Sequence, residues 1–231
     1  MMWENLKVYE PLPKSELVIV KKEIIKIIAE RLDPFGFKLY GRKLIKLSDD
    51  IVYIIHLDTR GSWSGVSCSL KTEISIVSIF DKEILVKGYE HFQKKYIQDI
   101  ISNLRNYYQI TAEYVLFADY ISRKLIEYII PYFNRYKDSK EIINCSDKFI
   151  LDNQNLLLYS ELVNHENNYS KGIITKKVNF MKGLKSNDMD ELFESTKLKK
   201  EIEESNWDEI DKMLNNNKIE VLKKLKINMV N

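Results

Sequence analysis

Carboxylate side chains offer the strongest catalytic potential in this sequence of 231 residues, because four of them fall close to predicted β-strands. These are Asp49, Asp50, Asp58 and Glu73. Paired acids can exchange protons with a substrate or hold a divalent cation when their surroundings differ. The adjacent pair Asp49-Asp50 is equally typical of a hairpin turn, and no second motif accompanies the acids. A metal-dependent hydrolase or nuclease is therefore the alternative function and not the first.

The common catalytic and cofactor motifs are incomplete or missing. The segment 61–65 reads GSWSG, but Trp63 occupies the central position that a nucleophile elbow gives to serine. The segment 165–169 begins as His-Glu, yet Tyr169 stands where a zinc-binding HExxH helix has its second histidine. Neither GxGxxG nor GxxxxGK[ST] occurs. The sequence thus predicts no catalytic residue, no metal site and no cofactor.

Basic residues are interleaved with aromatic ones between Phe37 and Lys46, where Lys38, Arg42 and Lys46 are spaced to face phosphate groups. A solvated edge strand protected by lysines explains the same pattern and is favoured. The chain carries 36 basic and 34 acidic residues, which gives a formal net charge of +2. A dedicated nucleic-acid binder normally has a clearly basic total, so nucleic acid is not the expected partner.

Four aromatic residues have the sequence surroundings of exposed side chains. They are Trp63, Tyr107, Tyr108 and Trp207. Trp and Tyr are enriched among the residues that carry most of the binding energy at protein interfaces. In a chain without catalytic motifs, these aromatics favour a partner-binding surface.

Local patterns predict a helix followed by an antiparallel sheet. Apolar residues recur every three or four positions from Ser15 to Leu32, behind a serine N-cap, which indicates an amphipathic helix. Pro34 and Gly36 are expected to end this helix and turn the chain. The predicted strands are Phe37–Tyr40, Leu44–Leu47, Ile51–Leu57, a half-buried strand within Val66–Ile79, and a short strand at Ile84–Val86.

The second half of the chain is predicted to be mainly helical. Helical spacing of apolar residues occurs within Gly88–Tyr108 and again from Thr111 to Phe133, where Pro131 should kink or end the helix. The tail has two charged helices, Asp188–Glu204 and Trp207–Lys226, with a break near the three asparagines 215–217.

Composition fits a folded α+β protein. Hydrophobic residues make up 45% of the chain, and glycine and proline number only 7 and 4, which argues against disorder. We expect an antiparallel sheet of three to four strands packed by helices, with a helical C-terminal extension. The predicted domains are an α+β core over residues 1–148 and an extension over residues 149–231, and the sequence leaves open whether the two form one domain.

The sequence favours a cytoplasmic protein that is not bound to a membrane. Cys68 and Cys145 form no metal-binding or disulfide pattern, so both are expected to be reduced thiols in the core. Residues 1–13 lack the charged and apolar regions of a signal peptide, and no run approaches the roughly 18 apolar residues of a membrane span. The abundance of Lys, Ile, Asn and Tyr is typical of an AT-rich genome and suggests a bacterial source.

The segment 35–46, FGFKLYGRKLIK, follows the first helix, and the segment 125–133, LIEYIIPYF, comes later. In this order they resemble an uncharacterised bacterial family of domains of unknown function. In that family a helix leads to a GF-K-x-x-G-R-x-aromatic strand, and a later helix ends in Pro-aromatic-Phe. The resemblance spans Ser15 to Asn144, but Leu44 replaces the usual aromatic residue and Ser69-Leu70-Lys71 departs from a strand that usually contains asparagine. It implies a fold, without an activity or catalytic residues.

Small α+β proteins often act as immunity or accessory partners in bacterial conflict systems, which is an analogy at the level of the fold. The function expected from the sequence is therefore a non-enzymatic protein-binding module, immunity-like, whose partner is another protein. RNA binding through the Lys38–Lys46 strand is a third hypothesis. The sequence leaves the oligomeric state open.

Overall fold

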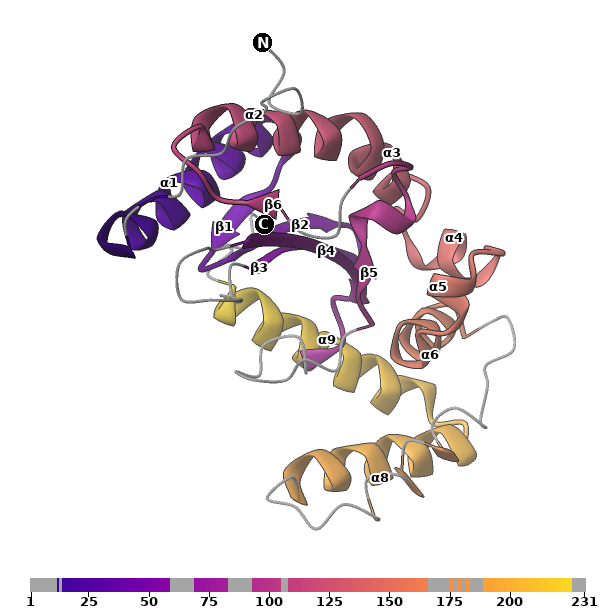
Figure 1. The fold of residues 1–231 in the computed structure, drawn as a ribbon. Helices are drawn as coiled ribbons and strands as arrows, with labels where there is room; N and C mark the ends of the chain where they lie inside the picture. The colour runs from indigo at the N-terminus through magenta and orange to yellow at the C-terminus, as the bar shows by residue number, and fades with distance from the viewer. Residues whose placement is uncertain are drawn as a thin grey trace. The chain divides into compact units, whose positions relative to one another are not determined.

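The computed structural model (Figure 1) describes residues 12, 14–58, 69–82, 93–104, 108–165, 175–176, 178–179, 182 and 189–225. The chain divides into two compact units. Unit 1 consists of Met1–Ser48, Val52–Ile76 and Lys94–Arg135, and unit 2 consists of Asp49–Ile51, Val77–Gln93 and Tyr136–Asn231. Unit 2 is therefore built from the C-terminal part of the chain together with two short segments of the N-terminal half.

Helix α1 (Lys14–Leu32) confirms the first predicted helix, although it begins one residue before the expected cap Ser15. Its buried face is the apolar stripe of the sequence: Leu17, Val20, Ile24, Ile25, Ile28 and Leu32. A 3₁₀ turn at Asp33–Phe35 follows, and its Pro34 prevents the α-helix from continuing. Gly36 then adopts a φ of +86°, in the left-handed region that glycine enters without steric cost.

In the described part of the chain six strands form the sheet, and they confirm the α+β class. They are β1 (Lys38–Tyr40), β2 (Lys43–Ser48), β3 (Ile51–Asp58), β4 (Ser69–Ser78), β5 (Lys95–Tyr96) and β6 (Tyr108–Gln109). Their order is β1-β2-β3-β4-β5, and β6 also pairs with β4. The expected strand at Ile84–Val86 lies outside the described residues.

Two sequence predictions about the sheet are wrong. Strand β4 is not half-buried as expected, because its side chains are buried on both faces from Thr72 to Ser78. In the described part of Gly88–Tyr108, the expected helix is replaced by β5 and a 3₁₀ turn at Ile97–Asp99. The apolar spacing there serves a strand end and a turn, because Lys95 pairs with Ile74 of β4.

The helical segment that follows β6 changes its winding near proline. Helix α2 (Tyr114–Lys124) passes into a π-helical turn at Leu125–Ile129, and α3 (Ile130–Phe133) ends the segment. Pro131 has no N–H to donate and its ring would crowd the carbonyl four residues earlier, which a wider turn relieves. The expectation that this proline kinks or ends the helix is confirmed, because α3 stops at Phe133, two residues after Pro131.

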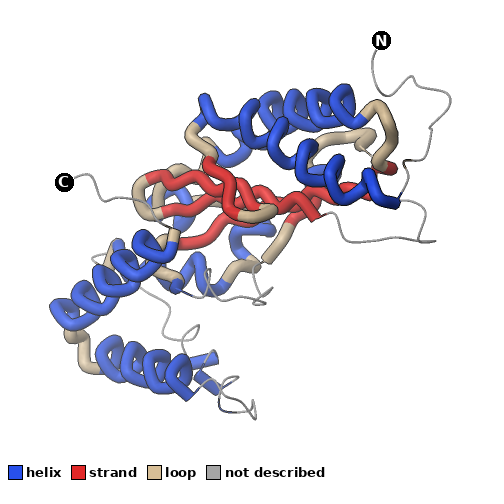
Figure 2. Tube along the Cα trace, turned by 90° about the vertical axis from the view of Figure 1, so that its left-hand side faces the viewer, coloured by secondary structure: helices blue, strands red, loops and turns tan. Residues whose placement is uncertain are grey.

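Aromatic stacking anchors this helical segment to the sheet. The ring of Phe133 lies 4.7 Å from that of Tyr53 in β3 and 6.0 Å from that of Phe37. Figure 2 shows α1 and α2 side by side over this face of the sheet. Arg31 of α1 and Asp119 of α2 form an ion pair, with 3.0 Å between Nε and Oδ1. The helices therefore cover one face of the sheet and leave the other to a different set of side chains.

The main helices of unit 2 all follow the sheet in the sequence. They are α4 (Ser139–Ile143), α5 (Lys148–Leu151), α6 (Gln154–Val163), α8 (Met189–Glu203) and α9 (Trp207–Lys224). The two charged helices of the tail are confirmed, but the break expected at residues 215–217 is wrong, because α9 runs through the asparagines. The chain instead turns at Ser205, whose φ is +55°. Among the described ranges, no helix combines the length and apolar character needed to cross a bilayer.

Candidate functional site

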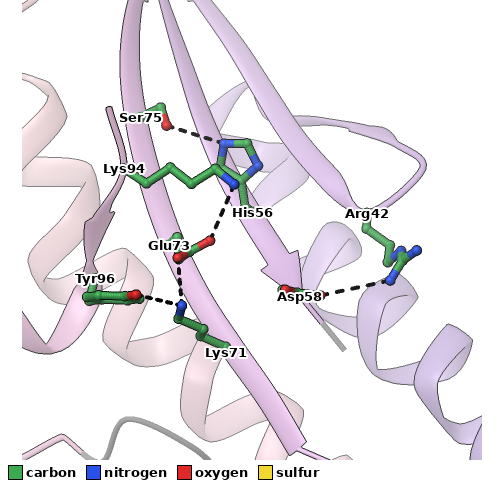
Figure 3. Close-up of polar contacts among 8 residues, drawn as sticks. All are labelled: Arg42, His56, Asp58, Lys71, Glu73, Ser75, Lys94 and Tyr96. Atoms are coloured by element: carbon green, nitrogen blue, oxygen red, sulfur yellow. Dashed lines mark hydrogen bonds and ion pairs between the residues drawn. The ribbon is translucent and has the colours of Figure 1, made fainter. Parts of the chain in front are cut away.

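A row of polar side chains lies on the face of the sheet opposite the helices. Lys71, Glu73 and Ser75 occupy every second position of β4 and so share one face. The neighbouring residue Ile74 belongs to the other face, because it pairs with Lys95, whose ammonium group lies 5.3 Å from the ring of Tyr132 in α3. With the residues that contact them, these side chains form what we call the polar face: His56, Lys71, Glu73, Ser75, Lys94 and Tyr96 (Figure 3).

Glu73 is the centre of the polar face. Its side chain is buried, with 7% of the residue exposed. One carboxylate oxygen lies 2.9 Å from Nζ of Lys71, and the other lies 3.7 Å from Nζ of Lys94. A buried carboxylate without such partners would carry a large desolvation cost, and the two ammonium groups offset that cost for Glu73.

Lys71 is held by two acceptors. Its ammonium group donates to the hydroxyl of Tyr96 at 2.7 Å and lies 4.0 Å from the centre of that ring. The sheet register explains this contact, since Tyr96 pairs directly with Glu73 across β4 and β5. Burial on its own would lower the pKa of Lys71, but the hydrogen bonds with Tyr96 and Glu73 outweigh it and raise the pKa. Lys71 is therefore a fixed cation.

His56 joins the polar face from β3. Its Nε2 lies 3.3 Å from the hydroxyl oxygen of Ser75, within hydrogen-bond distance. Ser75 has no exposed surface, so its hydroxyl orients the imidazole and is not placed to attack a substrate. Figure 3 shows the His56 ring at the Ser75 hydroxyl and the Lys94 side chain reaching the Glu73 carboxylate. A carboxylate, an imidazole and two ammonium groups thus lie on one face of the sheet.

A second ion pair lies near the end of β3. Nη1 of Arg42 is 4.0 Å from Oδ1 of Asp58, and about half of the arginine side chain is exposed. The backbone supports this approach, because the N–H of Leu57 donates to the carbonyl oxygen of Arg42 at 2.9 Å. Arg42 lies in the turn after Gly41, whose φ is +60°.

The four carboxylates singled out in the sequence are engaged within the fold. Asp58 and Glu73 are paired with cations in unit 1. In unit 2, Asp49 is a turn residue with a φ of +48°, as its sequence predicts, and Asp50 accepts hydrogen bonds from the N–H and the hydroxyl of Ser139. Within the described ranges, no group of three or more His, Cys, Asp or Glu side chains is arranged to hold a metal ion.

The structure describes two of the four aromatic residues predicted to form a partner-binding surface. Trp63 and Tyr107 lie outside the described residues. The expectation that Tyr108 is exposed is wrong, because its ring packs 5.5 Å from that of Phe117 and only 6% of the residue is exposed. Trp207 is partly exposed at the start of α9, where it stacks on the ring of His165 at 4.8 Å.

The three basic residues of the first hairpin do not share a surface. Lys38 pairs with Ile45 across β1 and β2, so Lys46 points to the opposite face of the sheet. Nζ of Lys38 is 2.6 Å from a carboxylate oxygen of Asp33, and Nζ of Lys46 lies 6.0 Å from the Phe37 ring. With Arg42 in the turn between them, this arrangement gives no single strip of cations for a phosphate backbone.

Of the two cysteines, the structure describes only Cys145. Cys68 lies outside the described residues, and Cys145 is a free thiol that is partly exposed instead of sitting in the core. Burial is the main cause that raises the pKa of Cys145, so the thiolate, which is the reactive form, is disfavoured.

Sequence reasoning found Glu73 but missed its neighbours. Polar residues at positions 71, 73 and 75 of an otherwise apolar strand were a usable signal, because alternation places them together. His56 and Lys94 carry no such signal, since only the folded sheet brings His56 to Ser75 and Lys94 to Glu73.

Comparisons of this chain with protein-family models, with curated proteins and with solved structures found no match. The resemblance to a family of domains of unknown function therefore stays a prediction.

Proposed function

We propose that this protein acts by binding another protein through the helical layer of unit 1. The observation that carries this proposal is a set of exposed aliphatic side chains on the two neighbouring helices. Val18 and Ile19 of α1, and Val115 and Leu116 of α2, are exposed by 39% to 64%. We call these four residues the aliphatic surface. Covering such side chains removes apolar area from water, which is the main driving force of protein association.

The kind of partner that we propose comes from the function expected from the sequence. An immunity-like or accessory protein of a bacterial conflict system would use such a surface to hold a toxin or another component. The metal-dependent hydrolase weighed against it draws no support from the described residues, because Glu73 and Asp58 already face cations. A metal ion at either carboxylate would have to displace an ammonium or guanidinium group.

The test is purification of the tagged protein from its source organism, followed by mass spectrometry of what co-elutes. Two variants disrupt the aliphatic surface, Val18→Asp with Ile19→Asp, and Val115→Asp with Leu116→Asp. We expect each double variant to recover at least about tenfold less of the partner protein than the wild type does. Residues at the centre of an interface contribute more than about 1 kcal/mol each to binding.

The matched control places the same new residues on a different helix. Lys223→Asp with Lys224→Asp changes two exposed positions of α9 and should retain the partner. The proposal fails when the wild type has no partner at a fixed ratio, or when both aliphatic variants retain it as the control does.

A further inference from the structure

We propose that two copies of this chain associate through strand β1, whose outer edge pairs with the same edge of the second copy. Such a dimer continues the sheet of unit 1 from one copy into the other. This inference goes beyond the proposed function, because it uses the backbone of β1 and not the aliphatic surface of α1 and α2. The two proposals are therefore tested on different residues and by different measurements.

Strand β1 forms one end of the sheet. Among the described strands, it has β2 as its single neighbour. Within the segment 35–42, Phe37 is buried and Tyr40 is partly buried, and the other six residues are exposed. The described part of the chain thus leaves this edge of the sheet in contact with solvent. An exposed strand edge presents backbone donors and acceptors to which another strand can bind.

The backbone of β2 shows which of its groups face β1. The carbonyl oxygen of Arg42, just before β2, accepts a hydrogen bond from the N–H of Leu57 in β3, at 2.9 Å. Along an antiparallel strand, the backbone groups of successive residues point alternately to the two neighbouring strands. Those of Arg42 point to β3, so those of Lys43 and Ile45 point to β1.

The pairing of β1 with β2 then fixes the direction of the Leu39 backbone. Lys43 lies opposite Tyr40, and Ile45 lies opposite Lys38. The backbone groups of Lys38 and Tyr40 therefore face β2. Because the direction alternates, the N–H and the C=O of Leu39, which lies between them, both point outward from the sheet.

An identical strand that runs antiparallel meets these two groups with the same two groups. When Leu39 lies opposite its own copy, each N–H donates to the C=O of the other chain. The contact is related by a twofold axis, so every bond is made twice. The Leu39 side chain is 42% exposed, and the same pairing brings the two leucines together across the axis and removes apolar surface from water.

The charges near β1 favour a second copy as the occupant of this edge. In the register centred on Leu39, Lys38 lies opposite Tyr40 of the second copy and Arg42 lies opposite Gly36, so no two cations are directly opposed. The two copies of Lys38 are diagonal neighbours. Each has its Nζ 2.6 Å from a carboxylate oxygen of Asp33, which offsets the repulsion between them.

The test is the mass of the full chain in solution, measured by sedimentation equilibrium over a range of concentrations. We expect the average mass to rise from the 27.4 kDa of one chain toward twice that value as the concentration increases to about 1 mM. Leu39→Lys and Leu39→Glu each place two like charges directly opposite one another. Each variant alone should raise the dissociation constant of the dimer by about tenfold or more.

Mixing the two charged variants tests the twofold pairing itself. An equimolar mixture of Leu39→Lys and Leu39→Glu should dimerise again, because the two new charges are then opposite in sign across the axis. The matched controls are Leu151→Lys and Leu151→Glu. Leu151 lies in α5 of unit 2 and is 44% exposed, so these variants change a leucine of similar exposure and should keep the wild-type dissociation constant.

Circular dichroism confirms that each variant is folded. If a charged variant does not fold, Leu39→Pro replaces it, because edge strands tolerate proline where the N–H faces solvent, and the loss of this donor should also weaken the dimer. The proposal is overturned if the wild type keeps the mass of one chain up to about 1 mM, or if folded Leu39→Glu dimerises as the wild type does. It is also overturned if the mixture stays monomeric, or if Val18→Asp with Ile19→Asp abolishes the dimer while Leu39→Glu does not.

Discussion

Glu73 is the residue on which the charge balance of the polar face depends. Replacing it with alanine leaves Lys71 and Lys94, each about one fifth exposed, facing each other without their shared carboxylate. Removing one member of a buried ionic group is strongly destabilising, because the partners keep their charge but lose its compensation. We expect Glu73→Ala to lower the free energy of unfolding by about 3 kcal/mol, measured by urea denaturation.

An exposed ion pair of α1 provides the control for this measurement. Lys26 and Glu30 lie 4.0 Å apart, with more than 60% of each side chain exposed. Glu30→Ala should change the free energy of unfolding by less than about 0.5 kcal/mol. A Glu73→Ala variant as stable as this control would show that the polar face adds nothing to stability.

For single residues, the sequence indicates which side chains share a face of a strand but not which distant residues they contact. Alternation along β4 is enough to assign Lys71, Glu73 and Ser75 to one face. Burial is less predictable, because Tyr108 looks exposed beside a polar segment and is buried by Phe117, nine positions further along the chain. Such contacts depend on tertiary packing and leave no local pattern to detect.

Among the elements, α8 and α9 are joined by a short charged contact that should respond to pH. Nζ of Lys197 in α8 lies 2.6 Å from Oε1 of Glu209 in α9. The hydrogen bond and charge of Lys197 lower the pKa of Glu209. A carboxylate with a lowered pKa stabilises the fold above its unfolded pKa of about 4.3, and this contribution is lost as the pH falls through the folded pKa.

We therefore expect Glu209→Gln to lower the melting temperature at pH 7 and to have the same melting temperature as the wild type at a pH below both pKa values. Thermal unfolding followed by circular dichroism across that pH range measures the difference. Glu203→Gln is the control. Glu203 lies 3.6 Å from Lys199 in the same helix, so this variant removes a similar ion pair that does not join two helices. If Glu209→Gln lowers the melting temperature by the same amount at every pH, this account is contradicted.

Elements were predictable from the sequence where a local pattern alone determines them. The stripe of α1 and the stop at Pro34 and Gly36 fall in this class, and so do the first three strands. Strand β5 does not, because two residues become a strand only through pairing with Glu73 and Ile74 of β4. The π-helical turn before Pro131 was also not predicted, since a proline indicates that the helix is interrupted but not which type of turn replaces it.

At the scale of the whole molecule, the two faces of the sheet in unit 1 differ chemically. The helices on one side expose aliphatic side chains, and the strands on the other carry the buried paired charges around Glu73. A sheet separates its two faces by alternation, so a substitution on α1 or α2 that keeps the fold leaves the side chains of the polar face in place.

The discontinuity of unit 2 leads to a prediction about fragments. Its helices bond to segments that lie far earlier in the chain. The N–H of Ser139 donates to Asp50 at 3.1 Å, and the side-chain amide of Asn217 donates to the carbonyl oxygen of Phe80 at 3.2 Å. Asn155 likewise donates to Asp81 at 3.3 Å. A fragment of residues 136–231 loses all of these acceptors, and the amides that used them stay unsatisfied wherever they are buried.

We therefore expect the fragment 136–231 to have less helix than the same region of the full chain and to unfold without a cooperative transition. Circular dichroism and urea denaturation of the fragment and the full chain measure both quantities. The full-length variant Asn217→Ala is the matched control, because it loses one of these bonds while keeping the segments, and it should still unfold cooperatively. A fragment that unfolds as sharply as the full chain would show that the C-terminal helices fold without residues 49–51 and 77–93.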